Sequence, residues 1–123
     1  MTDAVAVVQR QVDAYNAHDV DAFLSTYAAD ATVVRGDGQT LAAGHAAMRT
    51  HYERLFAENP DVHAEVATRL SNGNWIVDHE QLDGTAGRAE ALVAYQVEDG
   101  LIRRVVMLGP PQPFASSRQV ETH

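Results

Sequence analysis

Apolar residues in the first half of the chain recur three or four positions apart, which is the spacing of helices with one buried face. Thr2 or Asp3 is a good N-cap, and the pattern predicts a first helix over residues 3–16. Asp19 is placed to cap a second helix, and Gly44 opens a third. The three predicted apolar faces are Val5, Val8, Val12 and Tyr15; Val20, Phe23, Leu24 and Tyr27; and Met48, Tyr52, Leu55 and Phe56.

After Asn59-Pro60, where the third helix is expected to stop, the apolar period changes from about 3.6 to 2. A short β-branched strand is predicted earlier, at residues 31–34. Four later strands are predicted at residues 62–70, 75–83, 88–98 and 101–108, with turns at 71–74, 83–87 and 99–100. In the first of the four, Val62, Ala64, Val66 and Leu70 should share one face, and His63, Glu65 and Arg69 the other. Segregated helices and strands predict an α+β domain with helices packed on one face of an antiparallel sheet.

Length, composition and net charge restrict the number of domains and the classes of partner. The 123 residues suffice for one core, so we expect a pocket domain over residues 1–109 and an extended or disordered tail over 110–123. A net charge of −8 argues against a nucleic-acid partner. No apolar run approaches the ~20 residues of a membrane span. The N-terminus lacks the basic and apolar segments of a secretory signal, so a cytoplasmic location without a membrane partner is predicted.

Four segments carry a resemblance to a known family. They are Tyr15–Phe23 (YNAHDVDAF), Tyr27–Val33 (YAADATV), Gly44–Arg49 (GHAAMR) and Asp99–Val105 (DGLIRRV). With the element order, they resemble the nuclear-transport-factor-2-like superfamily, which includes SnoaL-like and ketosteroid-isomerase-like proteins. The resemblance implies a cone-shaped α+β barrel, with three N-terminal helices packed on a strongly curved antiparallel sheet around a small-molecule pocket.

The ketosteroid isomerases of this superfamily use an aspartate base, with a tyrosine and a protonated aspartic acid as oxyanion donors. The resemblance places Arg35 at the position of the base, Gln11 at that of the tyrosine and Val93 at that of the second aspartate. Tyr27 and Tyr52 match two supporting tyrosines. Because the three central positions differ, steroid isomerisation by that mechanism is not expected here.

The predicted strand at residues 75–82 carries polar residues on both faces, which is unusual for a strand lining a core. Asp78 and Glu80 share one face, and the resemblance turns that face toward the pocket. Two carboxylates about 6–7 Å apart can separate in pKa into an acid and a base. Arg35 or Arg104 could hold one of them ionised. The alternative is that both carboxylates only complete a polar core by hydrogen bonding.

His79 lies on the other face of the same strand, which in this family meets a second subunit. If the faces were reversed, His79 would become the general base in place of the carboxylates. An outward apolar stripe, predicted to hold a homodimer together, comprises Val77, Ile102, Val106 and Leu108.

The leading hypothesis is a cofactor-independent acid–base enzyme of isomerase, cyclase or hydrolase type. Its substrate would be an apolar oxygenated metabolite, with Asp78, Glu80 and Arg35 as catalytic residues. The chain has no cysteine and no HxxxH or HxH pair, so neither a metal nor another cofactor is predicted. The alternative is a non-catalytic ligand-binding or dimerisation domain. The predicted substrate-binding residues are Tyr15, Tyr27, His51, Tyr52, Phe56, Val93, Tyr95 and Met107.

Overall fold

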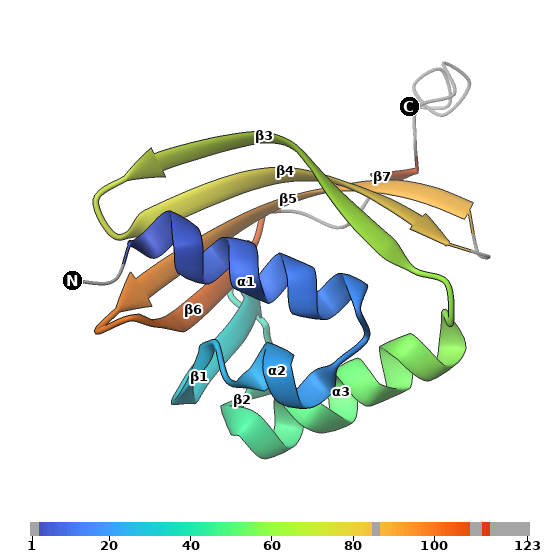
Figure 1. The fold of residues 1–123 in the computed structure, drawn as a ribbon, viewed down its shortest axis with the longest axis horizontal. Coiled ribbons are helices and arrows are strands. Elements are labelled where there is room, and N and C mark those ends of the chain that lie inside the picture. The colour runs from blue at the N-terminus through green and yellow to red at the C-terminus, as the bar shows by residue number, and fades with distance from the viewer. Residues whose placement is uncertain (1–2, 85–86, 109–111, 114–123) are drawn as a thin grey trace.

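The computed structural model of the protein describes residues 3–84, 87–108 and 112–113. The elements are α1 (Ala4–Asn16), α2 (Val20–Leu24), β1 (Tyr27–Arg35), β2 (Thr40–Ala43), α3 (Gly44–Glu58), β3 (His63–Asn72), β4 (Trp75–Gly84), β5 (Gly87–Glu98), β6 (Leu101–Met107) and β7 (Gln112–Pro113). The helices lie on one side of the sheet, so the chain has the predicted α+β architecture (Figure 1).

Helix starts follow from local chemistry. The Asp3 side chain accepts a hydrogen bond from the backbone N–H of Val5 at the start of α1. Asp19 does the same for Ala22 at the start of α2. Each carboxylate satisfies one of the amides that a first helical turn leaves without a partner, which confirms both predicted caps.

The sheet differs from the prediction in its topology. Its strand order is β2-β1-β6-β5-β4-β3, with β7 pairing β5. β1 pairs β6 in parallel, so the sheet is mixed and not wholly antiparallel. β2, which periodicity did not reveal, adds an antiparallel edge strand beside β1. Among the described residues the edge strands β2 and β3 do not pair, so the predicted barrel is an open sheet (Figure 1).

The core lies between the helices and the sheet. Its fully buried large side chains include Phe23 from α2, Met48 from α3, and Ile76 and Ile102 from the sheet. Ile102 was predicted to face outward, which is wrong. The β5–β6 register shifts between Gln96 and Val97, so Arg103 is an extra residue and Ile102 turns inward.

A second register shift, in β3, reverses another prediction. The β3–β4 pairing shifts between Val66 and Thr68, so Ala67 is extra. Beyond it, Arg69 faces the helices opposite Asp78, while Leu70 turns outward and is 65% exposed. The alternation read from the sequence had placed these two side chains the other way round.

In the part of the chain that the structure describes, no helix is long and apolar enough to cross a membrane. The predicted cytoplasmic location stays a prediction. Gln112 and Pro113, which fall in the predicted tail, form β7 against β5. Residues 110–111 and 114–123 of that tail lie outside the described residues.

Candidate functional site

A cavity of about 320 Å³ lies between the helices and the sheet. Its mouth includes Arg35, Leu41 and His51, which are exposed, whereas Glu80 and Tyr95 are buried within it. The polar lining is Gln11, Tyr15, Tyr27, Arg35, His51, Tyr52, Glu80 and Tyr95, and the remaining walls are apolar: Val12, Val33, Leu41, Leu55, Ala64, Leu82, Ala91, Val93, Val105 and Met107. Mostly apolar walls with a few converging polar groups are typical of small-molecule sites.

β4 carries Glu80 into this cavity. Alternation along the strand turns Ile76, Asp78 and Glu80 toward the helices, and the Glu80 side of the strand is the one predicted. Glu80 is 7% exposed and lines the cavity. The Tyr95 hydroxyl donates to Glu80 Oε2 at 2.8 Å. Among the described residues, Glu80 Oε1 has no hydrogen-bond partner, so it is available to a ligand.

Burial raises the pKa of Glu80 to about 7. The Tyr95 hydrogen bond opposes this by favouring the ionised form, the charge of Asp78 adds to the rise, and the more distant Arg69 opposes it. A carboxyl group with this pKa is present in both protonation states near neutral pH. Glu80 can therefore either accept or donate a proton there.

Four tyrosines, Tyr15, Tyr27, Tyr52 and Tyr95, surround the carboxyl group. Burial raises the pKa of each, that of Tyr15 to about 12, and the charge of Glu80 adds to every rise. All four hydroxyls are therefore protonated at neutral pH. They offer neutral hydrogen-bond donors around Glu80, the acidic group among the described residues that line the cavity.

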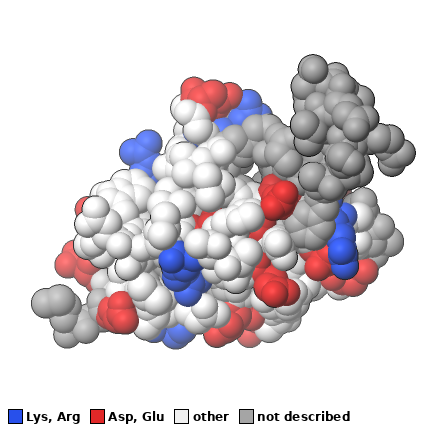
Figure 2. Space-filling view, turned by 90° about the horizontal axis from the view of Figure 1, so that it is seen from above, with Lys and Arg blue, Asp and Glu red and all other residues white. Residues whose placement is uncertain are grey.

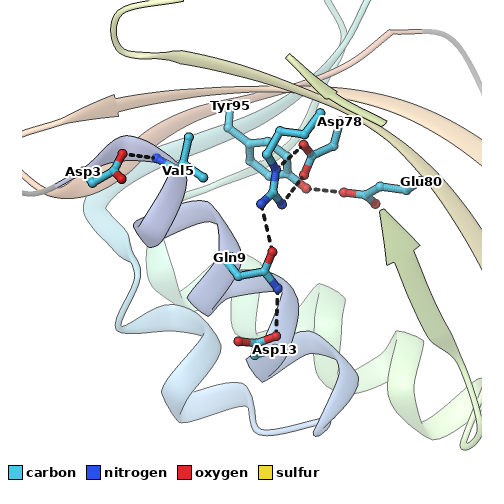
Figure 3. A network of polar contacts seen from close by, with 8 residues as sticks. Asp3, Val5, Gln9, Asp13, Asp78, Glu80 and Tyr95 are labelled. Atoms are coloured by element: carbon cyan, nitrogen blue, oxygen red, sulfur yellow. Dashed lines mark hydrogen bonds and ion pairs between the residues drawn. The ribbon is translucent and has the colours of Figure 1, made fainter. Parts of the chain in front are cut away.

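Asp78 has a different environment. It is 0% exposed and does not line the cavity. Arg69 binds it bidentately, with Nε to Oδ1 at 2.7 Å and Nη2 to Oδ2 at 2.9 Å (Figure 3). Arg69 Nη1 also donates to Gln9 Oε1 at 2.8 Å. The two carboxylates of β4 thus separate: Asp78 is closed off in an ion pair, and Glu80 faces the cavity.

Arg35 does not hold either carboxylate. It lies at the cavity mouth and pairs with the exposed Asp37 at 2.6 Å. Arg104, the other candidate, is exposed on β6. The arginine that pairs with Asp78 is the half-buried Arg69, which the apolar alternation predicted on the opposite face. The register shift at Ala67 moves it to the helix-facing side, and the apolar phase of β3 is interrupted at the same place by Thr68.

Most of the predicted ligand-binding residues do line the cavity: Tyr15, Tyr27, His51, Tyr52, Val93, Tyr95 and Met107. Phe56 does not, because its ring packs between Tyr15 and His18, stacked on the latter at 4.5 Å. His79 lies on the outer face, where its Nε2 lies 2.7 Å from Glu90 Oε1. Because His79 lies on the face of the sheet away from the cavity, it cannot act as a base there.

Gln11 is a cavity residue that the predicted set omitted. It was placed only by its match to a catalytic tyrosine of the isomerases. A polar residue on an otherwise apolar helix face is the signal that could have marked it, because Val7, Val8 and Ala14 share its buried environment. Within residues 3–84, 87–108 and 112–113, no three His, Cys, Asp or Glu side chains gather as a metal site would require.

The fold and the cavity define an α+β domain with an internal site between helices and sheet. Residues 8–105 match the model of the SnoaL-like domain, and the chain belongs to this family. A comparison with curated proteins found no match.

Solved structures share the fold. An uncharacterised cystatin-fold protein from Novosphingobium aromaticivorans is 24% identical with a TM-score of 0.81, over 89% of this chain and 99% of that one. A proposed ketosteroid isomerase from Kribbella flavida is 22% identical with a TM-score of 0.75, over 87% and 77%. A proposed polyketide cyclase from Streptomyces antibioticus is 16% identical with a TM-score of 0.76, over 86% and 91%. At these identities the likeness concerns the fold alone.

The Arg69–Asp78 pair gives a test of stability. In Asp78→Asn the half-buried guanidinium loses its charged partner, so the free energy of unfolding should fall by about 1–3 kcal/mol. Urea unfolding at pH 7 measures this. Asp37→Asn removes the exposed partner of Arg35 and should leave the unfolding curve unchanged. Wild-type stability in Asp78→Asn would contradict a structural role for the pair.

The pKa of Glu80 predicts a pH dependence. Its pKa is about 7 in the folded protein and 4.5 in the unfolded chain, so protonation of Glu80 stabilises the folded state. This stabilisation is fully present below pH 4.5 and is lost as the pH rises through 7, by up to about 3 kcal/mol. Glu80→Gln stays neutral, so it should match the wild type near pH 4 and exceed its stability at pH 8. The exposed Glu65→Gln is the control for urea unfolding across this range. Parallel curves for Glu80→Gln and the wild type would refute the raised pKa.

Proposed function

We propose that the protein is a cofactor-independent acid–base catalyst for a small, mostly apolar molecule that carries oxygen. One observation carries the proposal: within the described part of the chain, Glu80 is the carboxyl group that faces the cavity, with a pKa of about 7 and one oxygen without a partner there. A general base works best when its pKa lies near the working pH. Tyr95 fixes the orientation of the carboxyl group through its hydrogen bond at 2.8 Å.

The residues suit proton transfer next to a carbonyl group. Glu80 Oε1 would take a proton from the carbon, the C–H electrons would pass to the carbonyl oxygen, and a tyrosine hydroxyl would donate to the oxyanion. Return of the same proton to another carbon would complete an isomerisation. In a cyclisation the enolate carbon would instead bond to a second carbonyl carbon of the same molecule, the C=O electrons would pass to its oxygen, and Glu80 would return the proton to that oxygen. Tyr27 and Tyr52 are neutral donors in the same cavity, and such donors stabilise developing charge where water is excluded.

The names of relatives support this class of chemistry without fixing the reaction. Related structures are named as a proposed polyketide cyclase and a proposed ketosteroid isomerase. Both names describe chemistry at oxygenated, largely apolar molecules. This chain would perform it with Glu80 on β4, because Arg35, Gln11 and Val93 occupy the positions where the resemblance implies the isomerase's catalytic groups.

A second function, ligand binding without catalysis, is favoured by one observation. Asp78, half of the predicted catalytic pair, is sealed in its ion pair with Arg69, so the second carboxylate is structural. Without a second carboxyl group beside it in the cavity, Glu80 would then hold a ligand and not transfer its protons. Exchange of substrate protons with solvent distinguishes the two functions.

The test is an exchange assay in D₂O with a set of small aromatic and unsaturated ketones, followed by proton NMR. Wild-type protein should accelerate exchange of the protons next to the carbonyl for at least one ketone. Glu80→Gln should reduce that acceleration by about 10²–10⁴-fold while binding persists. The outer-face variant His79→Gln is the control and should exchange at the wild-type rate. Binding of ketones without exchange would favour the non-catalytic function.

We also propose a homodimer that packs through the outer face of the sheet. Val77, Ala94 and Val106 are cross-strand neighbours there, so they form an apolar row across β4, β5 and β6. Leu92 and Leu108 extend it and are 43% and 44% exposed. Seen from this side, uncharged residues predominate in the part of the surface that is not grey, with several charged side chains among them (Figure 2). A contiguous apolar surface on so small a domain is typical of an interface.

Sedimentation at micromolar concentration should show a dimer. Leu92→Arg places a charge on the exposed apolar surface, so it should shift the protein to a folded monomer whose thermal unfolding midpoint no longer rises with protein concentration. Ala57→Arg, on exposed α3, should remain dimeric and serves as the control. A wild-type monomer at these concentrations would contradict the interface.

A further inference from the structure

Gln11 presents an unsatisfied acceptor to the cavity. Its side chain is 5% exposed and lines the cavity from α1. Its carbonyl oxygen, Oε1, is buried and has no hydrogen-bond partner among the described residues. A buried polar atom without a partner costs about 1–3 kcal/mol, so native structures seldom keep one without a function.

The neighbouring Tyr27 does not satisfy this oxygen. Its side chain lies beside the Tyr27 hydroxyl, where it lowers the pKa of Tyr27 against the larger effect of burial. Tyr27 is protonated and can donate into the cavity. The two side chains together present one acceptor and one donor, and a hydroxyl group is the smallest neutral group that satisfies both.

We propose that the cavity recognises a ligand through a hydroxyl group, which donates its proton to Gln11 Oε1 and accepts a hydrogen bond from Tyr27. Gln11 is then a specificity-determining residue. The ligands that it selects are neutral, mostly apolar molecules that carry a phenol- or alcohol-type hydroxyl group. It deepens the proposed function, because it states what the molecule that Glu80 acts on must carry.

Other polar groups fit the pair less well. A ketone oxygen, an ether or a carboxylate has no proton for Gln11 Oε1, so the oxygen would stay unpaired in the complex. A carboxylate would also face Glu80 in the same cavity. An ammonium group could donate to Gln11 but has no lone pair for Tyr27, and its charge would have to be buried.

The first experiment compares three probes of similar size on the wild-type protein: 2-naphthol, 2-methoxynaphthalene and 1-naphthylmethylamine. Calorimetry measures the affinities, and shifts of the Val33, Val93 and Val105 methyl signals locate binding in the cavity. The naphthol should bind about 10–100-fold more tightly than its methyl ether, which keeps the ring but lacks the donor. Equal affinities would overturn the proposal, as would tighter binding of the amine or no naphthol binding at millimolar concentration.

The second experiment uses variants. Gln11→Met keeps a similar side-chain shape but removes the acceptor, so naphthol and methyl ether should bind equally. Gln9→Met makes the same substitution on the exposed face of α1 and should keep the wild-type preference. Unfolding curves check that both variants fold, and a preference retained in Gln11→Met overturns the proposal.

Glu80→Gln separates this inference from the proposed function. The variant should lose proton exchange yet keep the preference for naphthol over its methyl ether. Loss of the preference in Glu80→Gln would assign the hydroxyl to Glu80 and overturn the role of Gln11. A normal preference in a protein that never exchanges protons would instead leave Gln11 in place and remove the catalytic role of Glu80.

Discussion

Two carboxylates on one buried strand face cannot both stay ionised without compensation, and the rest of the site depends on how β4 meets this constraint. The charge of Asp78 is compensated by a bidentate ion pair with Arg69 on the neighbouring strand β3. The two N···O distances are 2.7 and 2.9 Å. Among the described residues, Glu80 receives a single hydrogen bond, from the hydroxyl of Tyr95, so burial dominates and raises its pKa to about 7. One arginine therefore separates two chemically similar residues into a structural anion and a proton-exchanging group.

Arg69 reaches Asp78 because β3 contains a single extra residue, Ala67. The shift at Ala67 brings Arg69 to the helix-facing side and sends Leu70 to the other. The shift at Arg103 similarly returns Ile102 to the core. Because side chains alternate with a period of two, each insertion exchanges the two faces for the remainder of its strand. The bulges thus determine both the polar site and the apolar outer surface.

The family's fold provides a cavity whose chemistry is set by a few positions. In this chain the acidic group is on β4, while α1 contributes an amide, Gln11, and the tyrosines come from α1, β1, α3 and β5. The walls around them are apolar, so a hydrogen bond from each polar group to a ligand is stronger than it would be in water. A shared fold is therefore compatible with a different arrangement of donors and acceptors from that of the isomerases.

Local chemistry in the sequence determined the helix caps at Asp3 and Asp19, the change from helical to strand periodicity, and the side of β4 that carries Glu80. These features depend on neighbours a few residues apart, which a pattern records. The parallel β1–β6 pair, the strand β2, the partner of Asp78 and the unpaired oxygen of Gln11 depend on contacts between distant segments. The apolar spacing is irregular at both bulges, but it does not tell which residue the neighbouring strand leaves unpaired. Whether a polar atom lacks a partner depends on the packing around it. Only the tertiary structure could decide them.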